Sequence, residues 1–384
     1  MSDGLRAKAT TALQRLVGAS TLERLGLSVA ALFAALLVGA VLLVASGYNP
    51  IVVYYYLFYG AIGSSFNVAL TLQQMTLLLF TGLAVAVSFR AGLFNIGTQG
   101  QLVLGALATA LTVLAVAPMV PGGVVGTVVL VPLGLVAGAV VGGAYGAIPG
   151  ALKAYADANE VITTIMLNFI ATGVTLYLVS GPFKDPESAA NQTVPLPEFA
   201  RFPSILFGSR QDFSLVAFAF GIVALVGLYY VIEHTAFGYD VRTSGIQPEA
   251  AEYGGVDAAK TVVASLTLSG ALGGVAGAMY VMMILGTFQT GLPSYGFDGI
   301  TVSILAGNNP LGVGVAALLF GILKSGTTVV QFATDVPPQL VGVLRGLIIL
   351  FVAMPEFFRL LGRRIAPSGP ERGPVATDGG RREG

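Results

Sequence analysis

The sequence predicts an all-α protein that is embedded in a membrane and crosses it about ten times. Its 384 residues are 55% hydrophobic and only 10% charged, with a mean hydropathy of +0.83, whereas soluble domains carry about 25% charged residues. Uncharged apolar runs of roughly 20 residues recur along the chain, the length a helix needs to cross a hydrocarbon core about 30 Å thick. The alternating pattern of a transmembrane barrel is missing, so we expect helices.

The predicted spans follow one another with few charges between them. They lie at residues 27–46, 72–89, 101–118, 124–147, 161–180, 214–232, 261–285 and 339–358. The apolar region 299–330 is interrupted at Asn308-Asn309-Pro310, so we expect two pieces, a short one at 299–307 and a longer one at 311–330. Segment 51–66 holds four tyrosines, and Gly60 and Gly63 should break it. It is too short for a further span and predicts an interfacial or re-entrant piece.

Basic residues predict the orientation of the chain. Residues 1–26 and the tail 359–384 are both rich in Lys and Arg, which by the positive-inside rule places both in the cytoplasm. With ten crossings, the inner segments hold fourteen Lys or Arg and the outer segments three: Lys184, Arg201 and Arg210. The first apolar run has no convincing cleavage site, so we expect an anchor and not a signal peptide. The predicted organisation is therefore a cytoplasmic segment 1–26, a transmembrane domain 27–358 and a disordered basic cytoplasmic tail 359–384.

Many of the 51 glycines recur at helical spacing. Gly134, Gly138, Gly142 and Gly146 repeat every four residues, and the pairs Gly270/Gly274 and Gly273/Gly277 do the same. Glycine faces allow close helix packing in a bilayer, so we expect them to face neighbouring helices or a second subunit. The alternative is that glycine is simply frequent in membrane helices.

Several classes of function are excluded. Nineteen basic residues balance nineteen acidic ones, so the electrostatic footprint of a nucleic-acid binder is missing. There is no cysteine and one histidine, His234, so neither disulfides nor a histidine-based metal cluster can form. Motifs for phosphate binding, zinc hydrolysis or serine hydrolysis are not found, and no carboxylate pair lies within the spans. We therefore expect no enzyme activity and no cofactor in this chain, but a passive pore or a pump driven by a separate ATPase.

Uncharged amides within or beside the spans are the candidate solute pathway. FNIGTQGQ at 94–101 joins two spans, and Asn and Gln offer both donors and acceptors, as a neutral polar solute requires. The candidates are Gln73, Gln74, Asn95, Gln99, Gln101, Asn168, Asn308 and Asn309. The alternatives are interhelical hydrogen bonds, satisfied turn amides and, for Asn308-Asn309-Pro310, a tight cytoplasmic turn.

Two bases, Lys324 and Arg345, lie within predicted spans. A base at such a depth suggests a functional role. Asp298 and Asp335 flank these spans as possible partners. For Arg345, near the end of its helix, snorkelling to the interface is the alternative.

Two loops between spans are long. Loop 181–213 is predicted to lie outside, where it could meet a partner. Loop 233–260 is predicted to lie inside, and Pro248 can begin a short helix that carries Glu249-Ala250-Ala251 and ends at Gly254-Gly255. Such a helix can dock into a groove of a partner.

Loop 233–260 resembles the EAA…G element of permease subunits of ATP-binding-cassette importers, through Glu249-Ala250-Ala251 and Gly255. Further segments are similar to the nucleoside and simple-sugar branch of the branched-chain amino acid and simple-sugar permease superfamily. These are Phe237-Gly238, Arg242, Gly245, FNIGTQGQ at 94–101, NEVITTIMLNFIA at 159–171, GPFKDP at 181–186, SGALGG at 269–274 and YGFDGITVSILAGNNPLGV at 295–313. The resemblance covers residues 30–360 and departs at Thr98, Lys324 and Arg345.

The resemblance implies a type II importer-like permease in the plasma membrane. It further implies a heterodimer with a second permease, an extracytoplasmic solute-binding lipoprotein, and cytoplasmic ATPase subunits that bind ATP and Mg²⁺. The residues expected to couple the chain to the ATPase are Arg242, Gly245, Glu249, Ala250, Ala251 and Gly255. We favour a nucleoside as solute, then a simple sugar, then a branched-chain amino acid. A stand-alone channel or secondary carrier for a neutral polar solute is the alternative class, and an integral-membrane enzyme the third.

Overall fold

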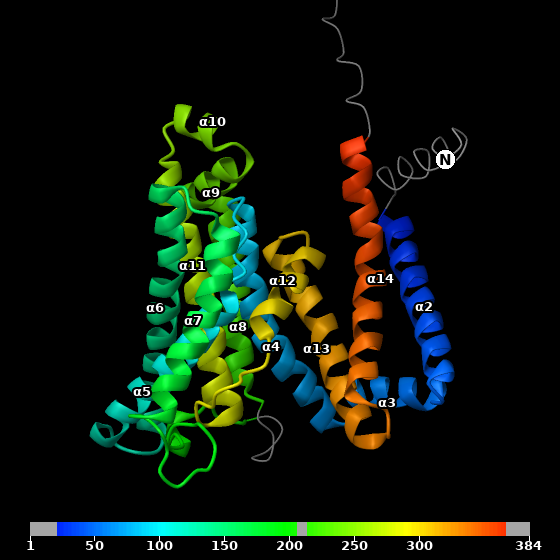
Figure 1. The fold of residues 1–384 in the computed structure, drawn as a ribbon, viewed down its shortest axis with the longest axis horizontal. Coiled ribbons are helices and arrows are strands. Elements are labelled where there is room, and N and C mark those ends of the chain that lie inside the picture. Colours follow the sequence, from blue (N-terminus) through cyan, green and yellow to red (C-terminus); the bar gives the residue numbers. More distant parts are fainter. Residues whose placement is uncertain (1–20, 206–212, 366–384) are drawn as a thin grey trace, which may run out of the picture. The chain divides into compact units, whose positions relative to one another are not determined.

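The computed structural model describes residues 21–205 and 213–365 (Figure 1). The chain forms two compact units. One combines residues 1–50 with residues 336–384, and its described part is a pair of packed helices, α2 (Thr21–Ala45) and α14 (Pro338–Ile365). The other unit spans residues 51–335 and holds every candidate pathway and coupling residue. Within the described ranges the regular secondary structure is helical, apart from one isolated β-bridge between Gln192 and Gln289.

The larger unit is a bundle of helices of very different lengths. In chain order they are α3 (Pro50–Ile62), α4 (Ser65–Arg90), α5 (Thr98–Val116), α6 (Val124–Ala156), α7 (Glu160–Ser180), α8 (Leu215–His234), α9 (Ala236–Ile246), α10 (Pro248–Tyr253), α11 (Ala258–Met279), α12 (Tyr295–Leu305) and α13 (Pro310–Ala333). Short 3₁₀ turns lie at Ala117–Met119 and Glu198–Ala200, and Tyr280–Leu285 continues α11 as a π-helix. Seven helices of the described part are long and apolar enough to cross a membrane. Each predicted span coincides with a helix, which confirms the all-α membrane fold.

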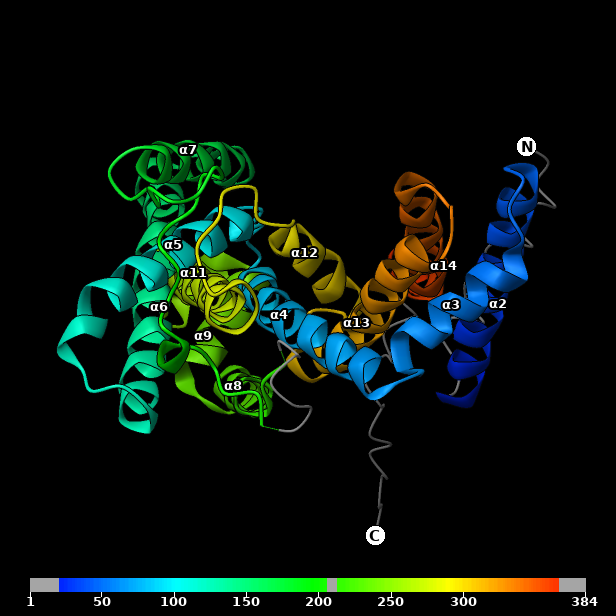
Figure 2. The same cartoon turned by 90° about the horizontal axis from the view of Figure 1, so that it is seen from below.

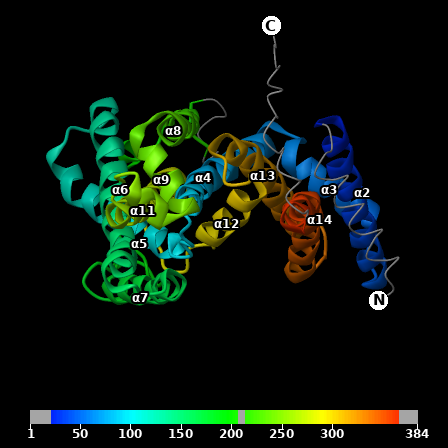
Figure 3. The same cartoon turned by 90° about the horizontal axis from the view of Figure 1, so that it is seen from above.

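Helix α11 lies at the centre of this unit, packed against α4, α5 and α6. Figures 2 and 3, which view the bundle nearly along its helices, show α11 among these neighbours. Helices α12 and α13 pack on the other side of α4, and α8 packs against α4 and α13. One end of the bundle carries α9 and α10, and we call it the α10 end; the opposite end carries α3 (Figure 1).

Glycine contacts hold α6 against α11. A Cβ on Gly142 would lie 2.7 Å from the Gly274 Cα, and a Cβ on Gly138 would lie 2.8 Å from the Gly274 carbonyl oxygen. Neither distance can accommodate a side chain, so the backbones touch only because these positions are glycine. The prediction that these glycine faces pack against neighbouring helices is confirmed. Gly270 and Gly274 face the glycines of α6, whereas Gly273 and Gly277 face α5.

Segment 51–66 does not span the bundle. Helix α3 lies across the ends of α4 and α13, where Ser325 Oγ donates to the Gly60 carbonyl at 2.6 Å and Asn67 Nδ2 donates to the Tyr59 carbonyl at 2.7 Å (Figure 1). The helix runs through Gly60, contrary to the prediction, and the chain breaks only at Gly63-Ser64. Gly60 does not break α3 because it is a packing position, where a Cβ would lie 2.6 Å from the Val329 Cβ.

The predicted interruption of 299–330 is confirmed. Helix α12 ends at Leu305 and α13 begins at Pro310. The turn passes through the left-handed region at Gly307 (φ 61°) and Asn308 (φ 58°), and Asn309 caps α13 by accepting from Leu311 N at 2.9 Å. With only 11 residues, α12 is about 16 Å long and therefore begins inside the bundle.

Candidate solute pathway and coupling site

The motif 94–101 folds into the bundle between α4 and α5. Asn95 is fully buried, and its Nδ2 donates to Gln101 Oε1 at 3.1 Å and to Ser269 Oγ of α11 at 2.8 Å. Ser269 Oγ in turn donates to the Ala84 carbonyl of α4 at 2.6 Å. The network therefore ties α4, the 91–97 segment, α5 and α11 together.

Asn168 connects α7 to the same segment. Its Oδ1 accepts from Gly100 N at 2.8 Å, and its Nδ2 donates to the Ile96 carbonyl at 3.0 Å. Because protein groups bind both the oxygen and the nitrogen of this amide, its hydrogen bonds match the alternative that it joins helices to one another. Whether Asn95, Gln101 or Asn168 contacts a solute stays a prediction, as it does for Gln73, which is buried in α4.

The N-terminal ends of α5 and α12 meet inside the bundle. Gln99 Oε1 accepts from Gly296 N at 2.8 Å, and Gln99 Nε2 donates to the Pro293 carbonyl at 3.1 Å. A Cβ on Gly296 would lie 2.8 Å from the Thr98 carbonyl carbon, so glycine is required for this contact. The Thr98 hydroxyl is buried beside it without a hydrogen-bond partner in the described part of the chain.

A charged cluster adjoins this junction. Lys324 Nζ of α13 lies 2.7 Å from Asp298 Oδ2 of α12 and 3.5 Å from the centre of the Tyr295 ring. The Tyr295 hydroxyl donates to Gln74 Oε1 of α4 at 2.7 Å. Of the two carboxylates proposed as partners, Asp298 is the one that pairs with Lys324. Arg345 lies in α14, in the other unit, and its role stays a prediction.

Asn308 and Asn309 lie at the α10 end of the bundle. Asn308 Oδ1 accepts from Ser303 Oγ at 3.0 Å, and its carbonyl accepts from Arg90 Nε at 2.9 Å. These two asparagines stabilise the turn between α12 and α13, far along the chain from the amides around Asn95. The structure thus separates the eight candidates into an interior group and a turn group.

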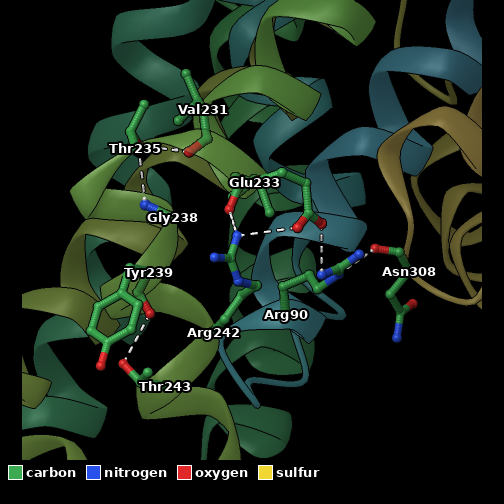
Figure 4. A network of polar contacts seen from close by, with 10 residues as sticks. Arg90, Val231, Glu233, Thr235, Gly238, Tyr239, Arg242, Thr243 and Asn308 are labelled. Carbon is green, nitrogen blue, oxygen red and sulfur yellow. Dashed lines mark hydrogen bonds and ion pairs between the residues drawn. The ribbon is translucent and has the colours of Figure 1, made fainter.

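An ion-pair network joins this turn to the loop after α8. Glu233, in the last turn of α8, lies 3.0 Å from Arg90 Nη1 and 3.3 Å from Arg242 Nη1 (Figure 4). Arg242 also donates to the Ile232 carbonyl. The three side chains are between 23% and 27% exposed, so water screens these pairs only in part. One carboxylate therefore links α4, α8, α9 and, through Arg90, the Asn308 turn.

Helix α9 packs on the end of α4 through two glycines. A Cβ on Gly92, at φ 71°, would lie 2.9 Å from the Gly245 carbonyl oxygen, and a Cβ on Gly245 would lie 2.9 Å from the Ala91 carbonyl carbon. Of the predicted coupling residues, Gly245 thus contacts the start of the 91–97 segment, and Arg242 reaches Arg90 of α4 only through their shared partner Glu233. Sequence reasoning missed α9 itself and missed Arg90 and Glu233, although both charges lie next to a span end.

Helix α10 confirms the short helix predicted from Pro248. It ends at Tyr253, and the chain turns at Gly254 and at Gly255, where φ is 86°. Ala251 is buried against the bundle, whereas Glu249, Ala250, Glu252 and Tyr253 are exposed. Glu249, Glu252 and Tyr253 line a surface pocket of about 390 Å³. The α10 end therefore presents a small acidic helix to its surroundings.

These features define a multi-pass helical membrane protein, in which buried amides and ion-paired side chains lie between helices of the described part. The chain belongs to the family described as branched-chain amino acid transport system / permease component, whose model matches residues 64–353.

Three relatives cover most of the chain. The nucleoside ABC transporter permease protein NupB of Lactococcus lactis subsp. cremoris is 35% identical over 83% of this chain and 87% of its own length. The guanosine permease NupP of Bacillus subtilis is 34% identical over 88% and 96%, and the glucose permease TsgB13 of Haloferax volcanii is 34% identical over 87% and 88%. The first two organisms each have a second, more distant matching permease, NupC and NupQ, at 28% and 26% identity. No solved structure matches the chain.

Proposed function

We propose that this protein is the permease subunit of an ATP-driven importer for nucleosides or simple sugars. The observation that carries the proposal is the similarity, over more than four fifths of the chain, to permeases named for nucleosides, guanosine and glucose. The chemistry of the interior supports it. In the described part of the interior, the polar groups around Asn95 and α12 are amides, hydroxyls and the paired Lys324 and Asp298, which suits a neutral solute with many hydrogen-bonding groups.

The energy source in this proposal is a separate ATPase that binds ATP and Mg²⁺ and docks on α10. Exposed Glu249, Ala250 and Tyr253 form the docking surface, and buried Ala251 and the turn at Gly255 hold α10 in place. Movement of α10 would reach α9 directly and then pass through Arg242, Glu233 and Gly245 to the end of α4. From there the 91–97 segment leads to the buried amides.

Further subunits complete the proposed importer. We assign a second, different permease chain as partner, in line with the paired permeases of the two organisms above. A solute-binding lipoprotein would dock on the outer side, at loop 181–213, and both termini would lie in the cytoplasm of the cell whose plasma membrane holds the complex. In the described part of the loop, backbone bonds from Thr193 to Phe288 and from Leu196 to Gly286 anchor it to the end of α11.

Uptake into proteoliposomes that contain the complete complex tests the solute and the energy source together. We expect ATP-dependent uptake of labelled guanosine, uridine or ribose in the presence of the binding protein. Uptake of leucine alone would overturn the solute assignment. Solute flux through the purified chain, without ATPase or binding protein, would instead favour a channel or a secondary carrier.

A substitution pair tests the docking surface. Ala250→Arg adds bulk and charge to the exposed face of α10, so stimulation of ATP hydrolysis by the solute-loaded binding protein should fall at least severalfold. Ala156→Arg makes the same change at the exposed end of α6 and should leave it unaltered. Equal stimulation in both variants of the assembled complex would refute the role of α10.

A further inference from the structure

The Lys324–Asp298 pair lies deep in the part of the bundle that must cross the membrane. Lys324 is the fifteenth residue of α13, which places it about 21 Å from the first residue of that helix and about 14 Å from the last. Full charges at this depth are costly and are tolerated when paired. Apolar residues would pack α12 against α13 at lower cost, so the presence of a charged pair calls for a role beyond packing.

The pair differs from the other interior polar groups in its exposure. Asn95, Gln101 and Ser269 are at most 1% exposed, whereas the side chains of Asp298 and Lys324 are 20% and 15% exposed. The pair is therefore partly accessible, whereas these amides and the Ser269 hydroxyl are not. Gln74 and Gln99, which hold Tyr295 and Gly296 at the same end of α12, are also only partly buried.

The contacts of the carboxylate leave it able to accept more hydrogen bonds. Among residues 21–205 and 213–365, Lys324 is the one side chain that the structure pairs with Asp298, through Oδ2. An ionised carboxylate offers about four acceptor positions on two oxygens. The ammonium group, which the Tyr295 ring also contacts at 3.5 Å, balances the charge and holds the carboxylate toward α13.

We propose that Asp298 is a solute-binding residue of the pathway and that Lys324 is its positioning residue. The proposal rests on the function proposed above and names a contact within it. The carboxylate accepts hydrogen bonds from two neighbouring donors of a neutral solute. Two groups of a nucleoside provide this chemistry, namely the N–H edge of a base such as guanine and the vicinal diol of the sugar, and a free sugar provides the second.

The contact is tested with the complete complex in proteoliposomes and an excess of solute-loaded binding protein. The measured quantity is the amount of solute taken up per ATP hydrolysed. Asp298→Asn keeps the shape of the side chain but removes the charge, so uptake per ATP should fall about tenfold or more for contacted solutes. Three solutes separate the two sources. If uptake per ATP falls for guanosine and 2′,3′-dideoxyguanosine, Asp298 binds the base edge. If it falls for guanosine and ribose but not for the dideoxy compound, Asp298 binds the diol.

A charge swap separates binding from packing. Asp298→Lys combined with Lys324→Asp keeps the ion pair but moves the carboxylate to α13. We expect this variant to assemble and to hydrolyse ATP, but to lose uptake of the same solutes. As a control, Lys153→Gln with Glu160→Gln removes a pair of 3.5 Å at the α10 end and should leave uptake unchanged.

Wild-type uptake by the swapped variant, or unchanged uptake of all three solutes by Asp298→Asn, would overturn the inference. Failure of the unaltered complex to take up any nucleoside or sugar would instead refute the proposed function. If Asp298→Asn does not assemble, the swapped variant decides the outcome, since it leaves no charge unpaired.

Discussion

Substitution of Gly142 by alanine should destabilise the protein, although alanine is the better helix former. In an isolated helix the change favours the helical state by about 1 kcal/mol. In the structure, the added Cβ would lie 2.7 Å from the Gly274 Cα, and the nearest atoms belong to the backbone of α11, which cannot rotate away. Carbon atoms pack at about 3.5–4.0 Å, so α6 and α11 would have to separate by roughly 1 Å. Overpacking of this kind costs about 1–3 kcal/mol.

Gly173 provides the matched control. It lies within α7, and a Cβ there would meet no atom within 4 Å, so Gly173→Ala keeps the helix-propensity gain without the clash. We expect Gly142→Ala to be less stable than Gly173→Ala by about 1–3 kcal/mol. To compare the stabilities, both variants and the unaltered chain are heated in detergent. The temperature at which half of the monodisperse protein is lost gives the order of stability of the three proteins. A Gly142→Ala protein as stable as Gly173→Ala would refute the backbone contact between α6 and α11.

Three further predictions concern the α10 end of the bundle. Glu233→Gln leaves Arg90 and Arg242 without their shared carboxylate. It should reduce solute-stimulated ATP hydrolysis by the complex more than the basal rate of hydrolysis. An equal reduction of both rates would contradict the proposed path from α10 through Glu233 to α4. Asn309→Ala removes the side-chain cap of α13 and should lower the stability by about 1 kcal/mol in thermal unfolding, whereas Asn309→Ser should retain most of it. The Lys260 side chain, 2.8 Å away, and then the Lys260 backbone N–H lower the pKa of Asp257 below its usual 3.8. Its stabilising contribution is therefore present above about pH 3.8 and is lost as the pH falls through the lowered value, a loss that Asp257→Asn should abolish in a pH series of melting temperatures.

The helices of this protein could be predicted from the sequence because each depends on local properties. A run of about 20 apolar residues must form a helix in a bilayer, whatever its neighbours, since no water is present to pair its backbone groups. The same applies to short-range signals. Pro248 with Gly254-Gly255 located α10, and Asn308-Asn309-Pro310 located the end of α12, because caps and breaks act within a few residues.

The roles of individual polar residues could not be predicted in the same way. Asn95 and Asn309 are the same residue type beside apolar runs, yet one joins three parts of the interior and the other caps a helix. Asp298 was one of two possible partners for Lys324, and only the crossing of α12 and α13 distinguishes it from Asp335. Glycine spacing predicted close packing, but not that the faces of α6 and α11 would meet each other.

By itself, the sequence determined that this is a helical membrane protein with about ten apolar segments and that loop 233–260 holds a short acidic helix. It also carried a family resemblance, which the matches to known permeases confirm. The tertiary structure alone decided which polar groups meet: Glu233 with two arginines, Asn95 with Ser269, and Asp298 with Lys324. The physical reason is range. Apolar burial and helix caps are set by residues within a turn or a span, whereas these contacts join residues that are far apart in the chain and adjacent only after the helices pack.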